Sequence, residues 1–394
     1  MEDTWEIKKI GDVCKVIAGQ SPEGKFYNNN GNGLPFYQGK KDYGEKYIGK
    51  PTTWTTKVTK EAEANDILLS VRAPVGPINF ATQKICIGRG LAAIRATKLI
   101  DKEFLFNFLL KLENEIVGNT GAVFNSINKA QIEAIEIPLP PIVVQQRIVS
   151  ILDEAFEAIA TAKSNAEQNL KNAKELFESY LQNVFSTKGI GWEEKTLEQI
   201  SKTFGRGKSR HRPRNYEKLY GGEYPFIQTG DIRNCNHYIT EYTQTYSELG
   251  LSQSKLWPSG TICITIAANI AETGVLTFDS CFPDSVIGLV VNDKLADRDF
   301  VEYLLQSFKV RIQALGKGSA QANINMGTFE NELFPFPSVK EQQTIVQKLD
   351  ALSTETIKLE AIYQQKIADL EELKKSMLQK AFSGELTTSK EIAV

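Results

Sequence analysis

Apolar and small side chains recur at steps of mostly three and four residues along two long segments, 142–188 and 338–383. Neither segment contains a glycine or a proline, the residues that most often interrupt a helix. Spacing of this kind over several heptads is typical of a coiled coil. We therefore predict two long helices, each with an apolar seam that needs a partner. The pattern leaves one alternative open, in which two unrelated amphipathic helices each cover their own domain.

The two helical segments belong to an internal repeat. The octapeptide SYLQNVFS at 179–186 returns as SMLQKAFS at 376–383, and IEIPLPPIVVQQRIVSILD at 135–153 aligns with ELFPFPSVKEQQTIVQKLD at 332–350. A repeat of this length indicates a tandem duplication, which favours helices that pack on each other. The predicted parts are a first domain at 1–140, a central helix at 141–188, a second domain at 189–337, a C-terminal helix at 338–384 and a tail at 385–394.

The pattern outside the helical segments predicts mixed helix and sheet, an α/β class of the α+β kind. Short helices are expected at 102–116 and 298–315. Strands are expected in the apolar runs between the polar, glycine-bearing loops. These runs lie at 66–71, 84–96, 261–267, 274–278 and 286–291.

Composition narrows the class of protein. The chain has 394 residues and a formal net charge of −2, so a nucleic-acid-binding surface would have to be a local basic patch. Five scattered cysteines and two histidines argue against a zinc site. The odd cysteine count and the lack of a secretory signal indicate a reducing cytoplasm, and no segment has the roughly 20 apolar residues of a membrane span.

Basic loops in both domains are the candidates for contacts with nucleic acid. The second domain carries GRGKSRHRPR at 205–214, and the first carries QGKKDYGEKYIGK at 38–50. An isolated basic loop is more often a solvated surface, but two such loops on duplicated domains favour phosphate or groove contacts. The residues chosen from charge and loop position are Lys40, Lys41, Arg72, Arg89, Arg206, Lys208, Arg210, Arg212, Arg233 and Asn323.

Catalytic motifs are not evident in the sequence. It has no GxxxxGK[ST] loop, no GxGxxG between a strand and a helix, and no [DN]PP[YF] motif of the kind that amino-methyltransferases use. Two histidines offer little for nucleophilic hydrolysis. We therefore expect no catalytic centre and no metal site in this chain.

The duplicated motif I-P-L-P-P…QQ-x-I-V-x-x-L-D at 137–153, with the W-E-x-K openings at 5–8 and 192–195, resembles the DNA-specificity subunit of type I restriction–modification enzymes. Val144 departs from the motif, because the second copy has Glu341 there. The resemblance implies two target-recognition domains, each reading half of an asymmetric double-stranded site. It also implies an antiparallel, pseudo-twofold pair of helices that sets the spacer.

The partners that the resemblance implies are two methyltransferase subunits, which bind S-adenosylmethionine, and nuclease–translocase subunits, which use ATP and Mg²⁺. This chain would hold neither cofactor and would be non-catalytic by itself. The octapeptides would lie at the ends of the two helices that set the spacer, and they would either close the coiled coil or dock a partner subunit. Candidates for these contacts are Ile148, Leu152, Leu181, Phe185, Ile345, Leu349, Leu378 and Phe382.

Three other interpretations remain open at this stage. The chain could be the specificity subunit for a fused methyltransferase–nuclease chain, which the neighbouring gene would reveal. It could be a coiled-coil scaffold that recognises proteins, which failure to bind any duplex would favour. A self-contained methyltransferase is the third, and the absent cofactor loop argues against it.

Overall fold

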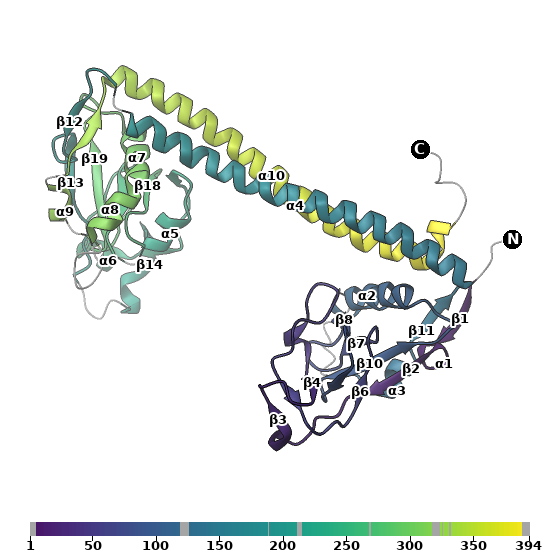
Figure 1. Ribbon diagram of the computed structural model, residues 1–394. Coiled ribbons are helices and arrows are strands. Elements are labelled where there is room, and N and C mark those ends of the chain that lie inside the picture. The colour runs from purple at the N-terminus through teal and green to yellow at the C-terminus, as the bar shows by residue number, and fades with distance from the viewer. Residues whose placement is uncertain are drawn as a thin grey trace. The chain divides into compact units, whose positions relative to one another are not determined.

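The computed structural model describes residues 5–118, 126–187, 189–210, 215–267, 269–316, 324, 326–330 and 332–387. They form two compact units, and each combines one globular domain with parts of both long helices (Figure 1). Unit 1 contains Met1–Glu167 and Gln364–Val394, and unit 2 contains Gln168–Tyr363.

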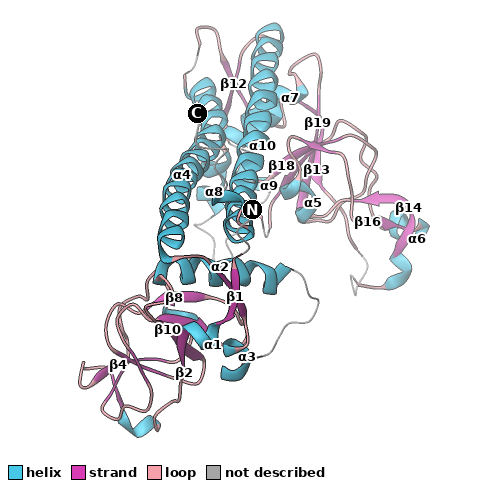
Figure 2. Ribbon diagram, turned by 90° about the vertical axis from the view of Figure 1, so that its right-hand side faces the viewer, coloured by secondary structure: helices cyan, strands magenta, loops and turns pink. Residues whose placement is uncertain are grey.

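The domain of unit 1 is built on an antiparallel sheet in the order β2-β10-β7-β8. A second sheet has the order β3-β5-β4-β9-β6, and β1 pairs with β11. Helix α2 (Lys102–Gly118) lies along the first sheet beside β8 and β10 (Figure 2). The other elements are β1 (Glu6–Lys9), α1 (Ile10–Val13), β2 (Cys14–Ala18), η1 (Gly24–Phe26), β3 (Tyr27–Asn28), β4 (Leu34–Tyr37), η2 (Lys40–Asp42), β5 (Trp54–Thr55), β6 (Glu61–Ala62), β7 (Ile67–Ser70), β8 (Ile78–Phe80), β9 (Ile85–Ile87), β10 (Leu91–Ala96), α3 (Lys129–Glu133) and β11 (Glu136–Leu139).

The domain of unit 2 repeats this plan with the order β13-β19-β17-β18-β15, a β14-β16 pair and a β12-β20 pair. Helix α7 (Arg298–Ser307) takes the place of α2 and packs beside β18. The other elements are β12 (Glu193–Lys195), β13 (Ser201–Arg206), η3 (Glu217–Leu219), β14 (Tyr220–Phe226), α5 (Thr229–Asn234), β15 (Tyr238–Ile239), β16 (Gln244–Tyr246), α6 (Glu248–Ser252), β17 (Ile262–Thr265), β18 (Thr273–Leu276), β19 (Val286–Val291), α8 (Lys309–Gly316), α9 (Met326–Glu330) and β20 (Phe334–Phe336).

Two helices of equal length, α4 (Ile142–Ser186) and α10 (Val339–Ser383), pack antiparallel. In unit 1 the first half of α4 lies beside the end of α10, where Lys163 Nζ is 2.7 Å from Glu371 Oε1. In unit 2 the end of α4 shares a core with the start of α10. After α10 the last described element is η4 (Glu385–Thr387). This pairing and the mixed helix and sheet confirm the predicted fold class.

Three local predictions need correction. The apolar run 84–96 is two strands in two different sheets, because the turn at 88–90 breaks it. The helix expected at 298–315 is interrupted at Phe308, between α7 and α8. Arg206 closes strand β13 and so lies outside the loop to which the sequence assigned it.

At the start of α10, Ser338 and Glu341 form half of a capping box. Ser338 Oγ accepts a hydrogen bond from the Glu341 backbone N–H at 3.3 Å, as a cap should. The Glu341 carboxylate instead accepts from Trp192 Nε1 at 3.1 Å, and so ties the start of α10 to the opening of the second domain.

Candidate nucleic-acid interface

Loops from both sheets of unit 1 meet along one line, which we call the first edge (residues 19–26, 38–42, 71–77 and 88–90). The backbone N–H of Gly90 donates to the Gln38 carbonyl at 3.1 Å, and the Gly90 carbonyl accepts from Val71 N–H at 2.9 Å. The Arg89 N–H donates to Ser21 Oγ at 3.2 Å. The loops after β2, β4 and β7 are therefore all bonded to the turn before β10.

Unit 2 assembles the corresponding loops in the same way, and we call this line the second edge (residues 207–210, 227–233, 266–272 and 281–285, without residue 268). Gly207 N–H donates to the Val286 carbonyl at 2.8 Å, as Gly19 N–H does to Leu91 at 2.9 Å. Ile266 N–H donates to Ser285 at 2.9 Å, as Val71 does to Gly90. These pairs show that Arg89 corresponds to Asp284 and Arg72 to Ala267.

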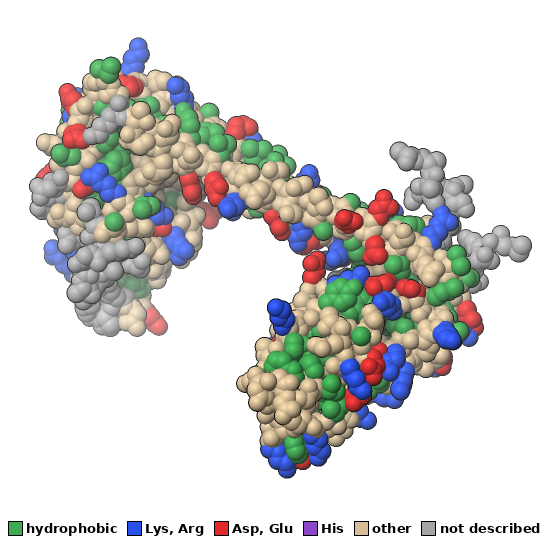
Figure 3. Space-filling model, in the orientation of Figure 1, with side chains coloured by type: hydrophobic (Ala, Val, Ile, Leu, Met, Phe, Trp, Pro, Cys, Tyr) green, Lys and Arg blue, Asp and Glu red, His purple; other side chains and the backbone are tan. Residues whose placement is uncertain are grey.

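The four predicted cations of the first domain all lie on the first edge. Lys40, Lys41, Arg72 and Arg89 are exposed, and none of them forms an ion pair with another described residue. Burial raises the pKa of Glu113, and nearby Lys40 partly offsets that rise. Lys41 has no such partner in the described part of the chain. Figure 3 shows Lys and Arg side chains gathered at the β3 end of this domain.

The second edge holds its predicted cations differently. The Arg206 side chain donates from Nε to the Asp284 carbonyl at 2.8 Å, so part of its guanidinium is occupied. Arg233 on α5 is exposed and donates to Asn269 at 3.3 Å. Lys208 and Arg210 are exposed in the loop after β13. Two predicted contacts, Arg212 and Asn323, lie outside the described residues.

Three further lysines on or near these edges were not chosen from the sequence, and each lies over an aromatic ring. Lys25 and Lys57 lie 5.2 Å and 5.0 Å from the centre of the Phe26 ring. Lys255 lies 3.5 Å from the centre of the Trp257 ring, and burial, with Lys208 nearby, lowers its pKa. Lys25 and Lys255 lie one and two residues before their aromatic partners, but such spacing is a weak signal, because the contact depends on the fold.

The paired glutamines of the repeated motif are structural. Gln145 is fully buried, donates to the Pro140 carbonyl at 2.8 Å and accepts from Asp101 N–H at 2.7 Å. Gln342 makes the same two bonds, to Pro337 at 2.8 Å and from Asp297 at 2.7 Å. The motif therefore fastens each long helix to the helix that covers its own domain.

The octapeptide that follows the first domain packs into the second domain, and the octapeptide that follows the second domain packs into the first. Phe382 packs against Phe104 and Phe108, with ring centres 5.0 Å and 5.4 Å away, and Phe185 packs 5.3 Å from Phe300. Burial of these side chains favours closure within the chain over a docking surface. The partner or coiled-coil candidates that are buried are Ile148, Leu152, Leu181, Phe185, Leu349, Leu378 and Phe382, and Ile345 is partly buried.

A buried ionic cluster supports the second domain. His237 Nε2 lies 3.4 Å from Asp299 Oδ1, and the other ring nitrogen contacts Glu302. Burial alone would lower the pKa of His237, but its bonds to Asp299 and Glu302 raise it to about 9. Tyr303 stacks on the imidazole and donates to Asp350 of α10 at 2.7 Å. The cluster therefore links α7, the segment before β15 and the long helix.

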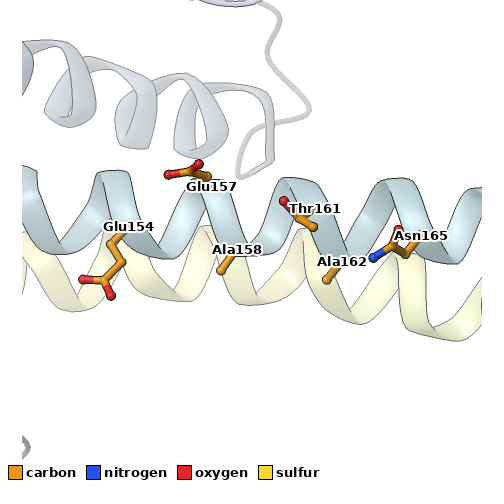
Figure 4. A pocket seen from close by; sticks show the side chains of 6 residues that line it. All are labelled: Glu154, Glu157, Ala158, Thr161, Ala162 and Asn165. Carbon is orange, nitrogen blue, oxygen red and sulfur yellow. The ribbon is translucent and has the colours of Figure 1, made fainter.

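Two surface hollows are found among the described residues, one of them on α4 and the other lined by Asn215, Glu217, Tyr220, Gly221 and Gln244. The hollow on α4 is lined by Glu154, Glu157, Ala158, Thr161, Ala162 and Asn165, all from one helix (Figure 4). One helix cannot enclose a cofactor, and no group of three metal-binding side chains occurs among the described residues. None of the helices searched there is long and apolar enough to cross a membrane.

Comparison with known proteins gives consistent matches. The family described as "Type I restriction modification DNA specificity domain" matches residues 2–172 and 189–371. The MjaIX specificity subunit of Methanocaldococcus jannaschii is 24% identical over 97% of this chain and 93% of its own length. The putative MjaX specificity subunit of that organism is 41% identical over 177 residues, and that match spans only 41% of its length and 44% of this chain.

A solved structure has the same fold over nearly the whole chain. The HsdS subunit from Thermoanaerobacter tengcongensis superposes with a TM-score of 0.65 at 20% identity, covering 98% of both chains. A chain from a study of complex assembly and conformational transition of the type I R-M system superposes with a TM-score of 0.79 at 19% identity, covering 97% of this chain and 98% of that one.

Proposed function

The chain belongs to the type I restriction–modification DNA specificity family, and from this premise we propose that its two edges read two unlike halves of one double-stranded DNA site. The observation that carries the proposal is that both domains build the same loop frame and fill it with different side chains. Arg89 on the first edge corresponds to Asp284 on the second, and Arg72 corresponds to Ala267. Different side chains on equal frames would select different bases.

The charges on the edges suit DNA better than a protein partner. Exposed lysines and arginines beside backbone amides are the groups that contact phosphates, and such contacts make binding fall steeply with salt. The overall charge of −2 does not oppose this, because the cations gather on the loops. A rival role as a protein-binding scaffold would not require them there.

The long helices complete the proposal. Because α4 and α10 are each fastened to a domain by a buried glutamine, they would set the spacer between the half-sites. Two methyltransferase subunits, carrying S-adenosylmethionine, and ATP-dependent nuclease–translocase subunits would dock on this chain. The chain itself would supply recognition and no catalysis.

A duplex selection tests the proposal. The chain is co-expressed with its methyltransferase subunit, the complex is mixed with random double-stranded DNA at moderate salt, and the retained DNA is sequenced. We expect two short, unlike motifs at a fixed gap. A single motif would mean that one edge alone reads DNA, and no enrichment by an intact complex would refute the proposal in favour of a scaffold.

A further inference from the structure

The turn at Gly88-Arg89-Gly90 holds one cation more rigidly than the rest of the first edge. A Cβ atom on Gly90 would lie 2.3 Å from the Gln38 carbonyl oxygen, and one on Gly88 would lie 3.0 Å from Gln38 Cα. A side chain at position 90 would therefore clash with the Gln38 backbone, and one at position 88 would need its neighbours to shift by a few tenths of an ångström. The Arg89 N–H is fixed on Ser21 Oγ, and the Gly90 N–H and carbonyl are both bonded.

The Arg89 side chain, in contrast, is exposed and makes no ion pair with another described residue. Its backbone is bonded to loops from two sheets, so it stands where the loops of the first edge converge. Arg89 therefore combines a fixed Cα with a free guanidinium, whereas Lys41 lies on the short η2 turn. Arg206 on the second edge differs again, because Asp284 already occupies its Nε.

We propose that Arg89 reads a guanine in the half-site bound by the first edge, and that Lys41 contacts phosphate. The planar guanidinium matches the O6 and N7 acceptors of guanine in the major groove, whereas an ammonium on a flexible stem acts as a point charge. Reading a base requires a side chain placed to within a fraction of an ångström, and the glycine-flanked turn supplies that placement. This assignment rests on the proposed function, because it presumes that the first edge binds DNA.

The test compares three variants in the complex with the methyltransferase subunit, using the duplex selection described above. Arg89→Gln removes the charge and the planar guanidinium, and Arg89→Lys keeps the charge without the guanidinium. Lys41→Gln removes a charge elsewhere on the same edge. Both positions are exposed, and co-purification with the methyltransferase subunit confirms assembly.

In the expected result, both Arg89 variants lose the preference for guanine at one position of one half-site, by about 5- to 150-fold. Arg89→Lys keeps the salt dependence of the wild-type complex. Lys41→Gln keeps every base preference and lowers the slope of log affinity against log salt by about one unit.

Two results overturn the inference. Unchanged base preferences in Arg89→Gln, with only a reduced salt slope, would make Arg89 a phosphate contact. Retention of the guanine preference by Arg89→Lys would show that charge alone is read. A wild-type complex that enriches no motif would instead refute the proposed function, so the two failures are distinguishable.

Discussion

Replacing Gln145 by leucine should loosen the joint between α4 and the first domain. The side chain is fully buried and joins three segments, with bonds to the Pro140 carbonyl at 2.8 Å and from Asp101 N–H at 2.7 Å, and a longer bond to the Leu99 carbonyl at 3.3 Å. Leucine has a similar volume, so the change removes hydrogen bonds without opening a large cavity.

The expected cost follows from the groups left without partners. The Pro140 carbonyl would lose a bond in a buried environment and the Asp101 N–H would lose one in a partly buried environment, at roughly 1–3 kcal/mol per group. We assign nothing to the longer Leu99 bond, because that residue is exposed and water can replace the glutamine. The free energy of unfolding of unit 1 should fall by about 2–6 kcal/mol, or roughly 4–24 °C in Tm for a unit of this size.

Thermal unfolding and amide hydrogen exchange of the full chain measure the effect. Gln146→Leu is the matched control, because Gln146 is adjacent and exposed and should shift stability by no more than about 0.5 kcal/mol. Gln342→Leu should expose the Asp297 amide to exchange while leaving Asp101 protected. The reasoning fails if Gln145→Leu matches Gln146→Leu and the Asp101 amide stays protected.

Three further outcomes are expected. Phe382→Ala should lower the free energy of unfolding, measured by calorimetry, by about 3–5 kcal/mol, since it removes a ring packed on α2. The exposed control Leu373→Ala should lower it by about 0.5 kcal/mol or less. Equal effects would contradict closure within the chain. His237 has its pKa raised to about 9 in the folded state, so its contribution to stability is complete below about pH 6.5 and is lost as pH rises through about 9. His237→Gln should flatten the dependence of the free energy of unfolding on pH in that window. An unchanged pH profile would contradict the role of the cluster in stability. Deleting one heptad from both α4 and α10 shortens each helix by about 10 Å, so the gap between the half-sites should shrink by about three base pairs. An unchanged gap in the selected DNA would show that the helices do not set the spacer.

The period of the apolar residues was enough to predict the long helices, because their pattern is local and repeated. The duplication also predicted the two similar domains. The motif around Gln145 was visible as a repeat, but its role was not, because its partner Asp101 lies 44 residues away. Its neighbour Gln146 is exposed, and nothing in the doublet itself distinguishes the two.

The edges could be predicted in part. Charge alone selected Lys40, Lys41, Arg72 and Arg89, but their gathering depends on β10 pairing with both β2 and β7, and on β4 running beside β9. These pairings join distant segments and leave no periodic trace. The break at 88–90 was missed for a related reason: apolar residues flank it on both sides, and the two strands diverge into different sheets only in three dimensions.

The duplication separates residues that hold the frame from residues that vary on it. Gln145 and Gln342 are buried and make the same bonds, so a change at either would cost several times the free energy of an exposed substitution. Arg89 and Asp284 occupy corresponding turns and have opposite charges, yet the bond from Val71 N–H to the first turn recurs as the bond from Ile266 N–H to the second. If the edges read bases as proposed, a frame that tolerates such a reversal would allow those bases to change without loss of the fold. The two halves of the site are therefore expected to differ.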